Sequence, residues 1–294
     1  MVKPIAGFAF WIAIVTATLA ASSGVAGVRS RHRSFRLPRG STILRAFAIP
    51  GRDDLLVYVF RHGKLRLLVT DGRTMRPASI AWSSRAESVD FCTWVDAVDF
   101  EHKFIYDSLP NHGGNYLSRQ TFDGKKEDIL GEPGMLDKTF VKQGTDLVYR
   151  ILFPPDMDRA YPKAYLALMR GAQVVKQIPI GYDPVNACYC RRTDTLYLVY
   201  LESMRTLAGK VIRLPNSHHD DAEPRPIDVD PAGCYAYYAD PYDHLLYKIR
   251  LEDGHVSRTR RLTMPVDGVT VAGSGRFIYL VNSDKRTIAK IARF

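Results

Sequence analysis

The chain has few residues of the kinds that zinc sites and nucleophilic hydrolases need. Four cysteines occur in its 294 residues, at Cys92, Cys188, Cys190 and Cys234, and no two of them form a CxxC pair, which argues against structural zinc. A GxSxG sequence is absent, which excludes the nucleophile elbow of an α/β-hydrolase. Recognised nucleic-acid-binding motifs are absent too, so we expect no nucleic-acid partner.

Charged residues are missing from the N-terminal stretch 4–28, which follows Lys3 and has small residues around Gly27. This pattern is typical of a signal peptide, and we predict one over residues 1–27, with a secreted or extracytoplasmic protein as the result. The stretch is also long enough to span a bilayer, so a membrane anchor formed by residues 4–28 is the alternative. No cysteine lies near it, which argues against a bacterial lipid anchor.

Positive charge exceeds negative charge in this chain, and the formal net charge is +10. The first basic cluster directly follows the apolar stretch and consists of Arg29, Arg31, Arg33, Arg36 and Arg39. A second cluster consists of Arg258, Arg260 and Arg261. Such clusters attract acidic partners through Coulomb forces that salt weakens. We predict that the first cluster binds an acidic or sulfated glycan, an extracellular protein or an anionic membrane surface; a solvated arm without a ligand is the alternative.

The same arginines bear on orientation, because positive charge next to a membrane segment favours the cytoplasmic side. If residues 4–28 were not cleaved, the first basic cluster would therefore favour an inward-facing protein over an outward-facing one. Secretion, an outward anchor and an inward orientation all stay open from the sequence.

A tyrosine returns six times at intervals of 40 to 48 residues, each time in a short apolar run. The six are Tyr58, Tyr106, Tyr149, Tyr197, Tyr237 and Tyr279. A period of this length with several short strands in each unit is typical of a β-propeller. We predict an all-β fold over residues 42–294: a single six-bladed propeller of four-stranded blades, with the tyrosines as packing anchors.

Each repeat carries the turns that separate four strands. In the fifth copy, an inner strand at 227–230 and a turn at 231–233 precede the tyrosine strand, and Asp253-Gly254 follows a third strand. Alternating residues divided by such turns predict β-hairpins. The sixth copy ends after its third strand. We therefore predict that residues 34–37, within a basic arm over 28–41, supply the missing strand and close the ring.

The tetrapeptide at 237–240, Tyr-Tyr-Ala-Asp, stands between Ile227-Asp228-Val229-Asp230 and Asp253-Gly254. In this arrangement the chain resembles the six-bladed propellers of the low-density-lipoprotein-receptor YWTD type, roughly over residues 46–294. It is similar, more loosely, to the senescence-marker-protein/gluconolactonase group. The first resemblance implies a recognition module. Four copies lack the aspartate of the box and carry Arg61, Leu109, Leu152 and Tyr200 instead.

The second resemblance implies a divalent cation, such as calcium, held by oxygen ligands in the central channel. Asp267 with Gly268 resembles the aspartate position of that group's motif, and Asp96, Asn186 and Asp228 lie on or near predicted inner strands, which line the channel of a propeller. The equivalent positions of the other copies carry Ala46, Trp94, Asp137, Val185 and Arg225, so the set is incomplete. The alternative is that these side chains cap turns or bond the backbone between blades.

We therefore predict a monomeric, extracellular recognition module that binds a protein or an acidic glycan. We expect it to have no catalytic residues and no cofactor. The alternative is a divalent-cation-dependent lactonase-type hydrolase, with Asp267, Asn186 and Asp228 as ligands in the channel.

In an exported protein the four cysteines are disulfide candidates, with three possible pairings. Cys188 and Cys190 are two residues apart on one predicted strand, so they share a face but lie too far apart along it to pair easily. A bond from one of them to Cys234, on the next blade, is geometrically reasonable. Buried free thiols are the alternative.

Overall fold

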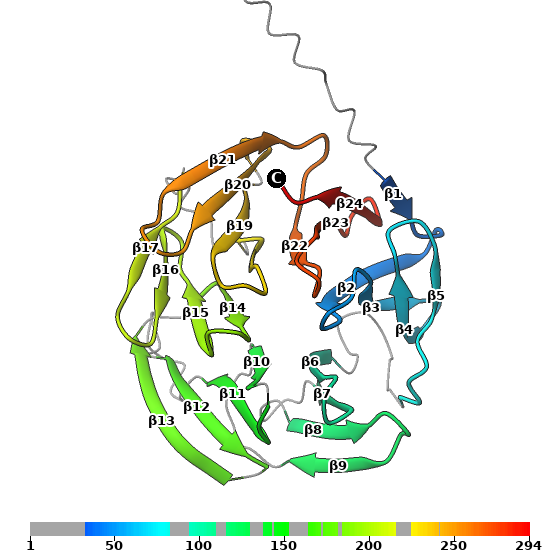
Figure 1. Ribbon diagram of the computed structural model, residues 1–294. Helices are drawn as coiled ribbons and strands as arrows, with labels where there is room; N and C mark the ends of the chain where they lie inside the picture. Colours follow the sequence, from blue (N-terminus) through cyan, green and yellow to red (C-terminus); the bar gives the residue numbers. More distant parts are fainter. Residues whose placement is uncertain are drawn as a thin grey trace, which may run out of the picture. The chain divides into compact units, whose positions relative to one another are not determined.

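The computed structural model describes residues 33–82, 94–109, 116–129, 138–142, 144–152, 164–171, 173–181, 184–215, 225–240 and 242–294. Within these residues the chain forms six four-stranded antiparallel sheets arranged as blades of a ring (Figure 1). The predicted all-β, six-bladed propeller is therefore confirmed. The predicted signal peptide lies outside the described residues, and among these residues none forms a helix long and apolar enough to cross a membrane.

The inner half of each blade consists of two strands. The strands closest to the centre are β2 (Ser41–Ala48), β6 (Trp94–Asp99), β10 (Lys138–Val141), β14 (Asn186–Cys190), β18 (Ile227–Val229) and β22 (Gly268–Val271). The second strands are β3 (Leu55–Arg61), β7 (Phe104–Leu109), β11 (Leu147–Leu152), β15 (Thr195–Val199), β19 (Tyr235–Asp240) and β23 (Phe277–Asn282).

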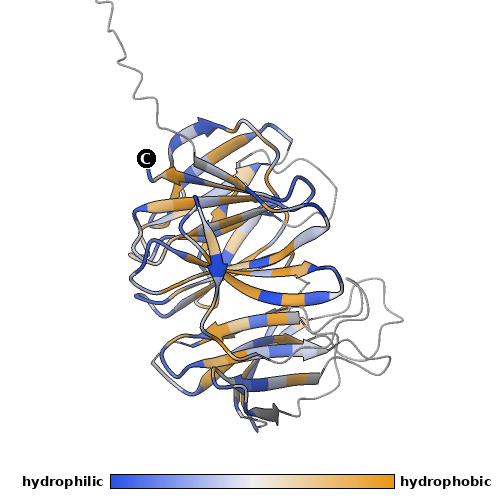
Figure 2. Ribbon diagram, turned by 90° about the vertical axis from the view of Figure 1, so that its right-hand side faces the viewer, coloured by the Kyte–Doolittle hydropathy of each residue, from blue (hydrophilic) through white to orange (hydrophobic). Residues whose placement is uncertain are grey.

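The outer half of each blade is more polar, and Figure 2 shows apolar and polar residues alternating along several strands. The third strands are β4 (Lys64–Thr70), β8 (Tyr116–Thr121), β12 (Ala164–Arg170), β16 (Ser203–Thr206), β20 (Leu245–Arg250) and β24 (Thr287–Ala292). The outermost strands are β5 (Met75–Pro77), β9 (Lys126–Ile129), β13 (Gln173–Gly181), β17 (Val211–Arg213), β21 (Val256–Arg261) and β1 (Arg33–Arg36). We number the blades 1 to 6 from the one that begins with β2.

The six recurring tyrosines all lie on the second strands and are all buried. Each belongs to a different one of six apolar clusters, and each cluster joins two neighbouring blades. Tyr237 of blade 5, for example, packs with Ile278 and Leu280 of blade 6. A strand covered on both faces can be apolar throughout, which explains why the tyrosine runs do not alternate. The tyrosines are packing anchors of the seams between blades, as predicted.

The ring closes through the N-terminal strand. β1 pairs antiparallel with β24, and Phe35 lies opposite Ile288 in that register. The backbone N–H of Leu37 donates to the carbonyl oxygen of Arg286 at 2.8 Å, which extends the pairing by one residue. Blade 6 thus obtains its fourth strand from the segment that was predicted to supply it, and its outer edge is covered.

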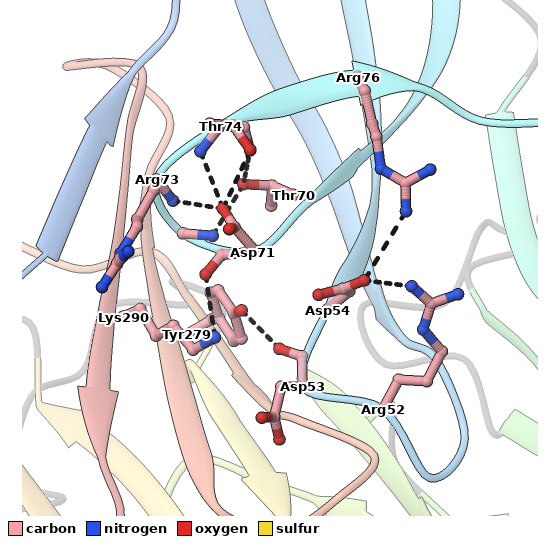
Figure 3. Close-up of polar contacts among 11 residues, drawn as sticks. Arg52, Asp53, Asp54, Thr70, Asp71, Arg73, Thr74, Arg76, Tyr279 and Lys290 are labelled. Carbon is pink, nitrogen blue, oxygen red and sulfur yellow. Dashed lines mark hydrogen bonds and ion pairs between the residues drawn. The ribbon is translucent and has the colours of Figure 1, made fainter.

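Polar contacts also join blade 6 to blade 1 (Figure 3). The hydroxyl of Tyr279 donates to the carbonyl oxygen of Asp53 at 2.6 Å, and Lys290 Nζ donates to the carbonyl oxygen of Asp71 at 2.9 Å. Asp71 and Gly72 form an Asp-Gly turn of the kind predicted at Asp253-Gly254, with a φ of +84° at Gly72, and a Cβ atom there would lie 2.7 Å from Cβ of Lys290. A glycine is therefore required both for the turn and for the close approach of blade 6.

Candidate functional site

The six innermost strands surround a central cavity of about 820 Å³ (Figure 1). Its volume falls within the range of small-molecule pockets. Polar side chains from five of the six innermost strands and from the segment before β22 line it: Arg45, Asp96, Thr139, Asn186, Asp228 and Asp267. The three predicted cation ligands are therefore all part of the channel wall.

Two of those predicted ligands, Asn186 and Asp228, hold neighbouring blades together. Asn186 Nδ2 donates to the carbonyl oxygen of Arg225 at 2.7 Å, which joins blade 4 to blade 5. Asp228 accepts from the backbone N–H of Val271 at 2.8 Å through Oδ2, which joins blade 5 to blade 6, and from the N–H of Val229 through Oδ1. Burial raises the pKa of Asp228 to about 7, although these two hydrogen bonds oppose the shift.

The third predicted ligand, Asp267, is exposed where the chain enters β22. Its Oδ2 accepts from the backbone N–H of Ser283 at 2.7 Å. Among the described residues, no group of three or more His, Cys, Asp and Glu side chains is placed to hold a metal ion. The structure thus shows these side chains in hydrogen bonds to the backbone, and the cation site stays a prediction.

The opposite wall, on blades 1 to 3, carries a different polar group. Arg45 Nη1 lies 3.9 Å from Asp96 Oδ1, and Thr139 lines the cavity from blade 3. Burial raises the pKa of Asp96 to about 6, while the charge of Arg45 and the hydroxyl of Ser108 oppose that shift. This carboxyl is therefore close to its titration point near neutral pH.

Sequence reasoning placed Asp96 near the channel but missed Arg45, Thr139 and the buried Arg150 of β11. The sequence does point to Arg150, because it is a charged residue directly after a tyrosine in a run that we expected to be covered on both faces. Burial lowers its pKa to about 10, and the charge of Asp96 opposes this.

A second, smaller cavity of about 120 Å³ lies at the outer edge of the ring. Ser34 of β1 lines it from blade 6, and Arg260 and Arg261 line it from β21 of blade 5. We call this the edge groove. The first basic cluster runs through β1 and the second lies on β21, and the groove itself is lined by Ser34 of β1 and by Arg260 and Arg261 of β21.

The five predicted ligand-binding arginines are placed as follows. Arg33 and Arg36 belong to β1, Arg39 follows it and is exposed, and Arg29 and Arg31 lie outside the described residues. Arg36 Nε donates to the carbonyl oxygen of Lys285 at 3.2 Å, which leaves its charge uncompensated by that contact.

Positive charges lie close together on β20 and β21, beside the groove. Lys248 of β20 lies opposite Arg258 in the β20–β21 register. Burial lowers the pKa of Lys248, and the positive charges of Arg293 and Arg258 lower it further, while the charge of Asp230 opposes this. Arg258 and Arg261 are exposed, and within the described part of the chain neither takes part in an ion pair. Positive charge is therefore concentrated on these two strands next to the edge groove.

Comparison with known proteins supports the fold and nothing finer. No protein-family model matches the chain, and no curated protein sequence matches it. Among solved structures, hydrazine synthase from Kuenenia stuttgartiensis contains a similar chain at 13% identity and a TM-score of 0.54. The similarity covers 81% of this chain and 80% of that chain. At this identity it shows the fold alone, and the YWTD or gluconolactonase type stays a prediction.

The described cysteines lie near the seam between blades 4 and 5. Cys188 and Cys190 are both buried on one face of β14, as predicted, and Cys234 is exposed after β18. Cys190 Sγ donates to the carbonyl oxygen of Asp230 at 3.9 Å, and Cys234 Sγ donates to that of Ala232 at 3.8 Å, so both are thiols here. Cys92 lies outside the described residues, and the disulfide pairing stays a prediction.

Proposed function

We propose that this protein is an extracellular, non-enzymatic recognition module that binds a sulfated or otherwise acidic glycan at the edge groove. The observation that carries the proposal is that β1 and β21, the strands on which the two basic clusters lie, come from opposite ends of the sequence and line one groove. If the first basic cluster were only a solvated arm without a ligand, the second basic cluster on β21 would remain unexplained.

Arginine suits this partner for a chemical reason. Its planar guanidinium donates two parallel hydrogen bonds, which match the oxygens of sulfate and carboxylate groups. Strand β21 presents Arg258, Arg260 and Arg261 within four positions of one extended strand. A linear polyanion can follow such a row, whereas a folded acidic protein needs shape complementarity as well. The groove therefore favours a glycan over a protein.

The lactonase alternative fits the geometry less well. An ion in the channel would need Asn186 and Asp228 to turn their oxygens from the backbone groups that they bind now. The link from Asp228 to Val271 would then be lost between blades 5 and 6. A recognition module does not require this link between blades 5 and 6 to break.

Heparin chromatography of the purified protein tests the proposal. We expect retention that salt reverses, and elution at clearly lower salt for the double variant Arg258→Ala/Arg261→Ala. The matched control is Arg192→Ala/Arg213→Ala, which removes two exposed arginines from blade 4 and gives the same net charge.

Equal loss in both variants would show that net charge, and not the groove, controls retention. No retention of the unaltered protein at low salt would contradict the glycan proposal. Capture of an acidic protein that heparin does not displace would replace the glycan by a protein partner.

A further inference from the structure

The central channel has irregular strands on one side only. The β2–β3 register shifts between Ile43 and Arg45, and the β6–β7 register shifts between Val95 and Ala97, which leaves Asp96 as the extra residue of β6. The innermost strands β10, β14, β18 and β22 pair with their neighbours without a shift. A β-bulge re-aims a side chain, and such bulges are frequent next to functional sites.

The bulge places Asp96 against the cavity with one oxygen unused. Asp96 is 6% exposed, and its Oδ2 has no hydrogen-bond partner among the described residues. Its Oδ1 faces Arg45 at 3.9 Å. A buried acceptor that stays unpaired costs about 1–3 kcal/mol, so this oxygen calls for a donor that the described residues do not supply.

A second unpartnered group comes from the next blade. Thr139 of β10 lines the same cavity and is 1% exposed, and its hydroxyl has no hydrogen-bond partner among the described residues. Its partner across the β10–β11 pairing is Arg150, which is fully buried and contacts Met169 Sδ at 3.7 Å through Nη1. Asp96 of blade 2 and Thr139 of blade 3 thus line one cavity, and each holds a buried polar atom without a partner among the described residues.

The charges of this wall select a neutral ligand. The positive charges of Arg45 and Arg150 would repel a cation, and the carboxylate of Asp96 would repel an anion. A hydroxyl group both donates and accepts, so it can donate to Asp96 Oδ2 and accept from Thr139 or Arg45. Phe140 and Tyr189 also line the cavity and offer apolar surface to C–H groups.

We propose that the channel binds a neutral polyhydroxylated small molecule, a monosaccharide or a cyclitol, through Asp96 and Thr139. The cavity of about 820 Å³ has room for such a molecule. This site lies on the innermost strands, and it does not depend on the edge groove or on its glycan.

Calorimetric titration and thermal melting of the full protein test this with three probes: D-glucose, D-galactose and myo-inositol. We expect at least one probe to raise the melting temperature of the unaltered protein, because a ligand that binds only the folded state stabilises it. Asp96→Asn and Thr139→Val should each weaken its binding by about tenfold or more, the size expected for one lost hydrogen bond in a buried site.

Two features separate lost binding from lost folding. Thr139→Val keeps the shape and removes a hydroxyl that has no partner, so the variant without ligand should melt at the same or a higher temperature. Asp99→Asn is the control on the same strand, because Asp99 is buried but bonds the turn at His102 and does not line the cavity. It should bind the probe as the unaltered protein does.

The proposal is overturned if none of the three probes stabilises the unaltered protein, since the cavity then holds water only. It is also overturned if both variants bind within about twofold of the unaltered protein. Binding of a cation such as choline, or of sulfate, in place of the sugars would contradict the proposal of a neutral ligand.

Discussion

The two walls of the central channel use polar side chains in opposite ways. On blades 4 to 6, the side chains of Asn186 and Asp228 form hydrogen bonds with the backbone of the next blade. On blades 1 to 3, Asp96 and Thr139 each keep a buried polar atom without a hydrogen bond among the described residues.

Position in the blade contributes to this difference. Asp228 lies opposite Tyr237 in the regular β18–β19 register, whereas Thr139 lies opposite Arg150, the residue after the tyrosine, in the β10–β11 register. Asp96 is the extra residue of the bulge in β6 and has no partner position on β7. The comparison teaches that one wall holds the ring and the other is available to a ligand.

The largest expected effect is on the wall of blades 4 to 6. Asp228→Ala should lower the free energy of unfolding by roughly 2–3 kcal/mol, because it leaves the N–H groups of Val271 and Val229 without their acceptor. Denaturant unfolding measures this change. Glu252→Ala, an exposed change on blade 5, serves as the control and should stay within about 0.5 kcal/mol. An equally small effect of Asp228→Ala would break the comparison.

The next effect is a pH dependence on the opposite wall. Burial raises the pKa of Asp96 from its ordinary 3.8 to about 6 in the folded protein, so folding favours its protonated form. Stability is then greatest below pH 4 for this group and falls as the pH rises toward 6, by about 2–3 kcal/mol in all. Unfolding of Asp96→Asn between pH 4 and pH 7 should show a shallower fall than the unaltered protein. Parallel curves would show that this carboxyl does not titrate in that window.

The propeller could be predicted from the sequence because its signals are local and repeated. In each copy the tyrosine run and its turns lie within a few tens of residues, and the sixth copy visibly ends at its third strand, Thr287–Ala292. Packing between blades then follows from the period, since every blade buries the same strand.

The candidate sites could be predicted only in part. Asn186, Asp228 and Asp267 were placed in the channel correctly, but which atoms their oxygens face depends on the neighbouring blade. The role of Asp96 depends on a bulge, which arises from pairing between strands and leaves no mark in a single strand's residues. The edge groove is lined by residues of both β1 and β21, and those strands come from opposite ends of the chain.

The smallest expected effect concerns calcium. Because Asp228 and Asp267 accept backbone N–H groups, we expect calcium to leave the melting temperature of the unaltered protein unchanged. Thermal melting with calcium and with a chelator measures this. A rise with calcium that Asp267→Asn removes would support the lactonase alternative and would justify lactone hydrolysis assays.

The most direct test of the difference between the walls is a crystal structure of the protein soaked with myo-inositol. We predict that the hydroxyl groups of the cyclitol lie within hydrogen-bond distance of Asp96 Oδ2 and Thr139 Oγ1, with Asn186 and Asp228 still bonded to the backbone. Binding to Asn186 and Asp228 instead, or a channel filled by water alone, would contradict the account.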